Sequence, residues 1–450
     1  MRKVLLITLL ACLVQKSALE TAFLKKIVAL NKAPDLKPLK KHLGFYEDTY
    51  LNFTELATKY GYPSEEHIVT TEDGYILTIF RLLTKCNEPK GYPVLMMHGI
   101  IDSSDGFIIP TPKKAIGYIL SNNCYDVWLL NNRGNVYSRR HTRLDPDRDV
   151  SYWNFSFDEI GYYDVPAVID HVLMRTNKKK VFYIGHSQGT TDFLVTTSLR
   201  PEYNEKLQLA VLIAPVAWMG HIRSPIPKIA ANFEKEIVGI LRALNILDLA
   251  PKNDIVPHQL LEFLCQVVPS EVCGTVGFIS VGDIVGVIPA QTLRVLYGHI
   301  LVGVAAKTVQ HYAQLITSKR FQRFDDGREV NLQKYGSIRP PLYNVSRVTT
   351  PTLLICAKHD WLSELKDVDV LRSKLPNVVE NYVVADPNWS HNSHIWGSKA
   401  PEYVFPKILQ HFYLQLCLSV CLLPLHTKTA EPTFLKSGME MLSAPKKGIG

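Results

Sequence analysis

The chain has 450 residues, of which 46% are hydrophobic and 20% are charged, and its net charge at pH 7 is +8. This composition provides enough apolar material for a large core and excludes a wholly disordered protein. The basic residues are scattered, and a short run at residues 178–180 precedes a predicted strand, so we expect no nucleic-acid binding. The length suits one large α/β domain with an insertion, or two ordinary domains.

The N-terminus has the pattern of a signal peptide. Two basic residues come before the apolar run 4–14, and small residues follow at Ser17 and Ala18. The run is too short to cross a bilayer as a helix, and a buried N-terminal helix is the alternative interpretation. We therefore predict a signal peptide over residues 1–18, followed by a Lys-rich pro-segment or surface arm over residues 19–45.

Sequons and cysteines agree with a secreted protein. The N-x-[ST] pattern marks Asn52, Asn154 and Asn344 as glycosylation candidates. A fourth sequon at Asn388 lies close to a candidate catalytic histidine, where a glycan would obstruct the site, so we expect it to be unused. Of the 8 cysteines, Cys12 would leave with the signal peptide, and the odd remainder requires at least one thiol that is free or paired between chains.

The first half of the chain alternates strands and helices. Alternating β-forming residues on both sides of residues 72–74 predict a hairpin. Downstream, short apolar runs alternate with segments of helical spacing, which is typical of a parallel sheet covered by helices on both faces. The predicted strands are residues 94–97, 126–130, 181–184 and 209–213, and the predicted helices are residues 113–121, 165–174 and 188–198.

A helical block interrupts this alternation. Residues 216–335 show helical periodicities and no clear strand, and predicted strands return at residues 352–355 and 381–384. An insertion between two strands of one sheet is typical of a cap or lid, so we predict one domain. Its core comprises residues 46–215 and 336–415, its cap residues 216–335, and an atypical or disordered tail residues 416–450.

A candidate nucleophile lies in a strand–turn–helix context. Residues 185–189 read G-x-S-x-G around Ser187, directly after the predicted strand 181–184 and at the start of a helix. In such a nucleophile elbow, small flanking residues allow a tight turn that projects the serine hydroxyl above the sheet. An ordinary glycine-rich turn between a strand and a helix is the alternative interpretation.

A serine hydroxyl needs a base, and the base needs an orienting acid. Asp360 follows the predicted strand 352–355 and His391 follows the strand 381–384, which matches the chain order serine, acid, histidine of this elbow type. We predict Ser187, Asp360 and His391 as the catalytic residues. The alternatives are His394 as the base, and Glu364, Asp367 and Asp386 as carboxylates that we expect to be solvated.

Other groups complete the predicted site. The backbone N–H groups of Ile100 and Gln188 are the expected oxyanion donors, and Gly99 lets the backbone approach the substrate. We interpret His98 as a structural residue that braces this turn. A metal site at His391 and His394 is disfavoured because no further ligand set accompanies the pair.

These residues resemble the acid lipases, a group within the α/β-hydrolase superfamily that includes gastric and lysosomal acid lipases and their insect relatives. The resemblance extends from about residue 52 to about residue 415. It is carried by residues 59–63 (KYGYP), 70–75 (TTEDGY), 98–99 (HG), 125–128 (YDVW), 132–135 (NRGN), 138–141 (SRRH), 155–159 (FSFDE) and 185–189 (GHSQG).

The resemblance implies an α/β-hydrolase fold, with a mostly parallel central sheet and a mobile helical cap or lid. It implies hydrolysis of neutral lipid esters, chiefly triacylglycerols, without a cofactor. The family's catalytic triad falls on Ser187, Asp360 and His391, and its oxyanion donors fall on Ile100 and Gln188. A single disulfide, between Cys265 and Cys273 in the cap, is also implied.

The sequence departs from the family pattern in places. The family segment reads His, apolar, Asp, aromatic, whereas residues 391–394 read His-Asn-Ser-His, which we expect to loosen the loop or alter the pKa of the base. A proline usual in the cap is missing from residues 299–303, and the tail has no family counterpart. We expect these changes to affect rate and substrate preference more than the reaction.

Three functions are compared. The first is a secreted lipase that acts on triacylglycerols at the surface of lipid aggregates, in the extracellular space or gut lumen, or in a lysosome. The second is a carboxylesterase for soluble or sterol esters, and the third is a catalytically weak lipid-binding protein. We favour the lipase, with peripheral contact to lipid and no transmembrane span.

Overall fold

A computed structural model describes residues 37–249, 262, 265–266 and 270–421. The predicted signal peptide, most of the predicted pro-segment, part of the predicted cap and residues 422–450 lie outside this part of the chain. A 9-stranded sheet forms the centre of the molecule, in the order β1-β2-β4-β3-β6-β7-β8-β9, with β5 paired to β2. Strands β1, β2 and β5 pair antiparallel, β2 pairs antiparallel with β4, and the strands from β4 to β9 in this order run parallel.

Each predicted strand is present, although β7 and β9 begin two and three residues earlier than predicted, and β5 was not predicted. The strands are β1 (Ser64–Thr70), β2 (Tyr75–Leu82), β3 (Val94–Met97), β4 (Val127–Leu130), β5 (Arg140–His141), β6 (Val181–His186), β7 (Leu207–Ile213), β8 (Thr352–Ala357) and β9 (Val378–Val384). The predicted hairpin is the pair β1 and β2, in register from Ser64 opposite Leu82 to Thr70 opposite Ile76.

Helices and short helical turns connect the strands. Outside the block between β7 and β8 they are α3 (Lys37–His42), η1 (Glu47–Thr49), α4 (Phe53–Lys59), η2 (Ser104–Phe107), α5 (Ile116–Asn122), η3 (Val150–Trp153), α6 (Phe157–Glu159), η4 (Ile160–Asp164), α7 (Val165–Thr176), α8 (Gln188–Leu199), η5 (Pro201–Lys206), η7 (Val345–Arg347), α16 (Leu365–Lys374), α17 (Ser393–Trp396), α18 (Ala400–Tyr403) and α19 (Phe405–Cys421).

Both faces of the sheet are buried because alternate side chains of each strand point to opposite faces. Phe182 and Ile184 of β6 pack in a core cluster with α5 and α19, whereas Val181 and Tyr183 pack in a second cluster with α7, α8 and α16. This two-sided burial explains why the central strands read as continuous apolar runs in the sequence.

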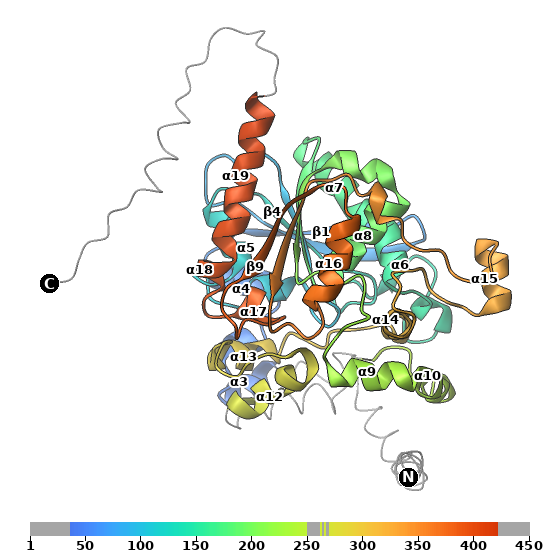
Figure 1. Cartoon of the computed structure of the whole chain (residues 1–450). Coiled ribbons are helices and arrows are strands. Elements are labelled where there is room, and N and C mark those ends of the chain that lie inside the picture. The colour runs from blue at the N-terminus through green and yellow to red at the C-terminus, as the bar shows by residue number, and fades with distance from the viewer. Residues whose placement is uncertain (1–36, 250–261, 263–264, 267–269, 422–450) are drawn as a thin grey trace.

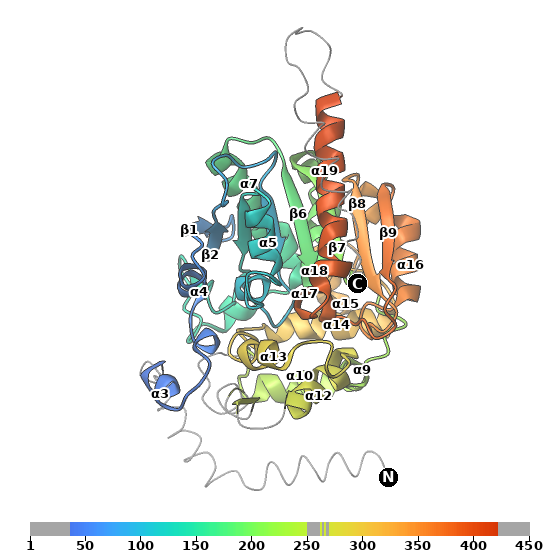
Figure 2. The same cartoon turned by 90° about the vertical axis from the view of Figure 1, so that its left-hand side faces the viewer.

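Further helices lie between β7 and β8 in the chain. They are α9 (Pro225–Asn232), α10 (Glu234–Ala243), α12 (Ser270–Val281), α13 (Ala290–Leu296), α14 (Ala306–Ser318) and α15 (Arg328–Tyr335). Figures 1 and 2 place α9, α10, α12 and α13 together at one end of the sheet, while α19 projects beyond the opposite end. These four helices therefore cover one end of the strands, as a cap would.

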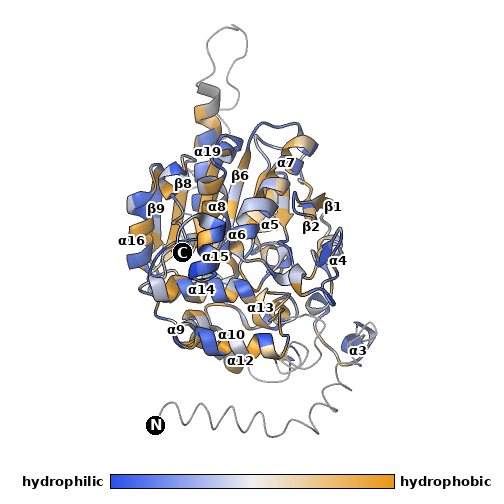
Figure 3. Ribbon diagram, turned by 90° about the vertical axis from the view of Figure 1, so that its right-hand side faces the viewer, coloured by the Kyte–Doolittle hydropathy of each residue, from blue (hydrophilic) through white to orange (hydrophobic). Residues whose placement is uncertain are grey.

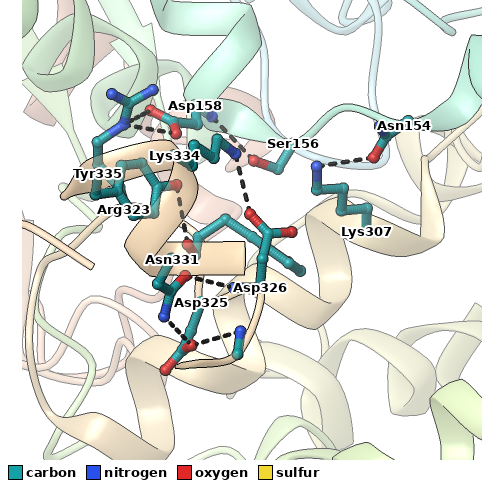
Figure 4. A network of polar contacts seen from close by, with 12 residues as sticks. Asn154, Ser156, Asp158, Lys307, Arg323, Asp325, Asp326, Asn331, Lys334 and Tyr335 are labelled. Atoms are coloured by element: carbon teal, nitrogen blue, oxygen red, sulfur yellow. Dashed lines mark hydrogen bonds and ion pairs between the residues drawn. The ribbon is translucent and has the colours of Figure 1, made fainter. Parts of the chain in front are cut away.

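Polar contacts attach the end of this inserted block to the core (Figure 4). Arg323 Nε donates to Asp158 Oδ2 at 2.9 Å, and Lys307 Nζ of α14 donates to Asn154 Oδ1 at 2.9 Å. Asp158 belongs to α6, beside the helix of the nucleophile elbow, so these contacts fix α14 and the chain just before α15 against the core.

Two sequence expectations need correction. The resemblance implies one disulfide, but the structure contains Cys86–Cys124 as well as Cys265–Cys273. The extra disulfide forms because the loop after β2 passes the end of α5, where the two Cα atoms are 5.3 Å apart. The tail was expected to begin at residue 416, but α19 continues to Cys421, with Leu416 packed on the core. Cys356 and Cys417 are free thiols.

Among the described helices, none has the length and apolarity that crossing a membrane requires.

A buried arginine joins three segments of the core. Arg133 Nη1 contacts Asp73 of the β1–β2 hairpin at 2.6 Å, and Arg133 Nε donates to Asp164 at 2.8 Å. The guanidinium also lies over the ring of Tyr75, 3.9 Å from its centroid. Since Arg133 is only 1% exposed, these two carboxylates compensate the cost of burying its charge.

We predict that Arg133→Met lowers the free energy of unfolding by roughly 3–5 kcal/mol, because it leaves the buried Asp164 and the partly buried Asp73 without their counter-charge. Urea denaturation followed by circular dichroism measures this change. The control is Arg148→Met at an exposed ion pair with Asp145, which should change stability by less than about 0.5 kcal/mol. Equal effects of the two substitutions would contradict the assigned role of Arg133.

Candidate active site

Ser187 occupies a strained turn between β6 and α8. Its backbone has φ 53° and ψ −117°, a conformation that L-residues rarely adopt. The turn closes because its two flanking glycines lack side chains: a Cβ on Gly185 would collide with the backbone of Gly189, and a Cβ on Gly189 with that of Met97. The hydroxyl is consequently held at the carboxyl edge of the parallel strands.

The structure brings the three predicted catalytic residues together. His391 Nε2 lies 2.8 Å from Ser187 Oγ, and His391 Nδ1 lies 2.8 Å from Asp360 Oδ2. Asp360 follows β8 and His391 follows β9, and all three side chains are less than 10% exposed. This arrangement lets the imidazole accept the serine proton while the carboxylate fixes its tautomer.

Asp360 is held as an acceptor. Its Oδ1 accepts the backbone N–H groups of Leu362, at 2.9 Å, and Ser363, at 2.7 Å. Burial alone would raise the pKa of Asp360, but the charge and hydrogen bond of His391 and the N–H of Ser363 lower it below its ordinary value. The carboxylate therefore stays ionised beside the imidazole.

Charges around the imidazole favour its protonated form. Burial would lower the pKa of His391, but Asp360, through its charge and hydrogen bond, and the charge of Asp283 raise it above the ordinary 6.5. Two further histidines contact this region as neutral groups, because burial lowers the pKa of His186 and that of His394 to about 3 each. His186 Nε2 donates to the backbone oxygen of His391 at 3.1 Å.

The alternative acid and base residues lie elsewhere. His394 Nδ1 accepts from the indole of Trp389 at 3.2 Å, and His391 is the histidine that reaches Ser187. The expectation of a solvated Asp367 is wrong: this carboxylate is 3% exposed and binds His221, because α16 packs its first turn against the loop after β7. Glu364 pairs with Arg223 at 2.7 Å.

The loop after β3 passes over the nucleophile. A Cβ on Gly99 would lie 3.4 Å from Cβ of Ser187, so the absence of a side chain leaves room for a substrate there. Ile100 follows in this loop, and Gln188 is the first residue of α8, where an N–H has no acceptor within the helix. His98 is buried with Nδ1 2.7 Å from the oxygen of Gly99, and burial lowers its pKa to about 4.

A pocket of about 240 Å³ opens beside Ser187 and His391. Its walls combine the loop after β3 with the inserted helices α12 and α13. The apolar lining includes Ile100, Ile101, Val281, Ile284, Ile288, Leu293, Leu296, Ile300, Leu301 and Trp396. The lining is mostly apolar and also includes Ser187 and His391, which is a combination expected for an ester with an apolar chain.

Comparison with known proteins identifies the family. The family model described as "alpha/beta hydrolase fold" matches residues 92–398, and the family model described as "Partial alpha/beta-hydrolase lipase region" matches residues 53–111. Lipase 1 of Drosophila melanogaster is 38% identical over 373 residues, which cover 81% of this chain and 80% of the relative. The chain belongs to this family of α/β-hydrolase lipases.

Mammalian relatives are similarly close. Human lysosomal acid lipase/cholesteryl ester hydrolase is 32% identical, covering 80% of this chain and 90% of the relative. Mouse gastric triacylglycerol lipase is 34% identical, covering 80% and 91%. A solved structure from Sulfolobus solfataricus shares the fold at 13% identity, with a TM-score of 0.55 and coverage of 78% of this chain and 94% of that one. The enzyme class of this lipase is carboxylic ester hydrolase.

Sequence reasoning missed two groups of the lipase site. Arg223 Nη2 donates to the backbone oxygens of Lys358, at 2.7 Å, and Asp360, at 3.0 Å, and so supports the acid loop, which we define as residues 358–364 between β8 and α16. Asp283 contacts the loop of His391. Both residues precede their partners by more than 100 positions and lie outside any local motif, so no signal in the sequence connects them to the site.

We predict that Asp360→Asn lowers kcat for a soluble ester by about 10⁴-fold, because the amide no longer stabilises the charged imidazole. Without the charge of Asp360, burial lowers the pKa of His391. The residual activity should therefore persist to lower pH than in the parent. Steady-state rates from pH 4 to 9 measure both effects. An unchanged kcat would exclude Asp360 as the partner of His391.

Proposed function

We propose that this protein is a secreted lipase that hydrolyses neutral lipid esters of the triacylglycerol class through an acyl-enzyme on Ser187. The observation that carries the proposal is the 2.8 Å contact between Ser187 Oγ and His391 Nε2, with Asp360 bound to the other ring nitrogen. The name of the mouse gastric relative, a triacylglycerol lipase, supports this substrate class, whereas the name of the human lysosomal relative points to cholesteryl esters, the alternative substrate.

In the first half of the reaction, His391 Nε2 takes the proton of Ser187 while Oγ attacks the ester carbonyl carbon. Negative charge develops on the carbonyl oxygen, and the N–H groups of Ile100 and Gln188 stabilise it. Each such donor typically contributes about 10²- to 10³-fold to the rate. The protonated His391 then gives its proton to the departing alcohol oxygen, and the acyl group remains on Ser187.

In the second half, water replaces the alcohol. His391 takes a proton from this water, the hydroxide attacks the acyl carbon, and the fatty acid leaves as Ser187 regains its proton. Asp360 stays ionised throughout and stabilises the imidazolium form of His391. The apolar pocket beside Ser187 fits the acyl chain and excludes water from it.

Ser187→Ala tests the mechanism. Removal of the hydroxyl should lower hydrolysis of p-nitrophenyl butyrate by at least about 10³-fold while the thermal melting temperature stays close to that of the parent. Ester hydrolysis by this variant at the parental rate would refute the acyl-enzyme. Rates on emulsified trioleoylglycerol, on cholesteryl oleate and on soluble short esters then separate a lipase from a sterol esterase and a soluble carboxylesterase.

The inserted helices expose an apolar surface that we propose contacts lipid aggregates. This apolar cap face consists of Ile226 and Ile229 of α9, Ile237 and Ile240 of α10, and Leu244 directly after α10, each at least 38% exposed. Lys228 and Lys235 lie among them. Figure 3 shows hydrophobic segments on α9 and α12 at this end of the molecule. Exposed apolar groups of this kind, mixed with basic residues, suit an interface with lipid.

We predict that Ile237→Glu combined with Ile240→Glu lowers activity on emulsified long-chain triacylglycerol by about tenfold, because two large apolar side chains no longer enter the lipid surface. Activity on soluble p-nitrophenyl butyrate should stay at the parental level. The matched control is Met174→Glu on α7, an exposed apolar residue away from the cap. Equal losses on both substrates would contradict interfacial binding by this face.

Secretion is part of the proposal. Two disulfides in the described chain suit an oxidising compartment. The sequon residues Asn52, Asn154 and Asn344 are all exposed, so each is accessible to glycosylation. The predicted signal peptide directs the chain into the secretory pathway, which leads to the extracellular space, the gut lumen or a lysosome, and secretion is the destination that we propose.

A further inference from the structure

A buried carboxylate of the cap contacts the loop that carries His391. Asp283 lies between α12 and α13 and is 5% exposed. We define the base loop as residues 390–393. Asp283 Oδ1 accepts from Ser390 Oγ at 2.5 Å and from the backbone N–H of Asn392 at 3.2 Å, and Asp283 Oδ2 accepts from Asn392 Nδ2 at 2.6 Å. The two residues that flank His391 are therefore bound by one side chain.

We propose that Asp283 is a positioning residue for the catalytic histidine, a cap carboxylate that holds the base loop so that His391 reaches Ser187. The inference deepens the proposed function, because it concerns how the base of that same site is oriented. Asp283 acts through Ser390 and Asn392, and it does not contact Ser187 itself among the hydrogen bonds of the described residues.

The hydrogen-bond pattern fits an ionised carboxylate. Each group that faces Asp283 in the base loop is a donor, and a carboxylate that accepts without donating is the charged form. Burial raises the pKa of Asp283 above its ordinary value, although the hydrogen bonds of Ser390 and Asn392 and the charge of His391 reduce the increase. Tyr297 of α13 also lies within electrostatic range.

The segment that carries Asp283 is itself fixed to the core. The backbone N–H of Trp361, next to Asp360, donates to the oxygen of Val281 at 3.2 Å, and the N–H of Ser398 donates to the oxygen of Val287 at 3.0 Å. Gly282 has φ +85°, and a Cβ there would collide with the ring of Trp361. The segment 281–287 thus joins the acid loop to the chain beyond the base loop, which gives Asp283 a rigid support.

This support explains how a short loop of small polar residues holds the imidazole of His391 in position to reach Ser187. Ser390 also contacts Ser393 Oγ at 2.9 Å, so the base loop has internal bonds of its own, but those bonds do not connect it to another element. Asp283 supplies a connection to the cap. Because a misplacement of about 1 Å in a catalytic group can cost about 10²-fold in rate, loss of this connection should affect kcat.

The charge of Asp283 provides a second, separable effect. The titratable groups that face His391 are Asp360 after β8, Asp283 from the cap, His186 at the end of β6 and His394 of α17. Both carboxylates favour the imidazolium form, so removal of either charge allows His391 to lose its proton at lower pH. A residue that merely stabilised the cap would not move the pH profile.

The test compares Asp283→Ala, Asp283→Asn and a matched control. Asp283→Ala should lower kcat for p-nitrophenyl butyrate by about 10- to 100-fold, with KM changed by less than about threefold. Asp283→Asn keeps an oxygen acceptor and removes the charge, so the acid limb of its kcat/KM profile should shift to lower pH. The control is Asp248→Ala, a cap carboxylate that binds Arg139 at 2.6 Å and the N–H of Val304 at 3.1 Å, away from the base loop. It should retain the parental kcat and pH profile.

A double-substitution cycle makes the test independent of folding defects in one variant. If Asp283 acts through Asn392, then Asp283→Ala with Asn392→Ala should lose less activity than the product of the two separate losses. Parental kcat in Asp283→Ala, a loss no larger than in the Asp248→Ala control, or multiplicative losses in the cycle would each overturn the inference.

Labelling of Ser187 by an alkyl fluorophosphonate separates this inference from the proposed function. The labelling rate reports how well His391 activates Ser187 and requires no ester turnover. A parent protein that labels rapidly but hydrolyses no carboxylic ester would refute the proposed function, and slower labelling of Asp283→Ala would still support the role of Asp283. Equal labelling rates in parent and Asp283→Ala would overturn the inference alone.

Discussion

The strained turn at Ser187 is the constraint on which the rest of the site depends. A residue with φ 53° and ψ −117° costs of order 1–3 kcal/mol, and the surrounding structure must hold it. The parallel pairing of β6 with β3 and β7 and the packing of α8 provide that support. Gly185 and Gly189 are required because the chain approaches itself too closely there for any side chain.

Electrostatic interactions then give the buried titratable groups around His391 different protonation states. Asp360 keeps its charge because it accepts two backbone N–H groups and faces His391. His186 and His394 stay neutral because burial is not offset by a bound carboxylate among their described partners. The same low-polarity environment that neutralises these histidines strengthens the interaction between His391 and Asp360.

The inserted helices both line the pocket and hold the catalytic loops in place. They line the pocket beside Ser187 and present apolar side chains outward on α9 and α10. Through the segment 281–287 they also hold the loops of the acid and the base. Within the inserted block, the chain around Asp283 is therefore anchored to the core, whereas α10 has no buried residue.

The sequence by itself determined the order and type of the main elements, because two-sided burial makes parallel strands continuous apolar runs, as at residues 94–97 and 181–184. It also pointed to Ser187, Asp360 and His391, since each follows a strand in a recognisable order. The tertiary structure alone decided that His391 and not His394 reaches the serine, that Cys86 meets Cys124, and that Asp367 is buried. These outcomes, together with the contact of Asp283 with the base loop, depend on distances between segments far apart in the chain, which local spacing and composition do not encode.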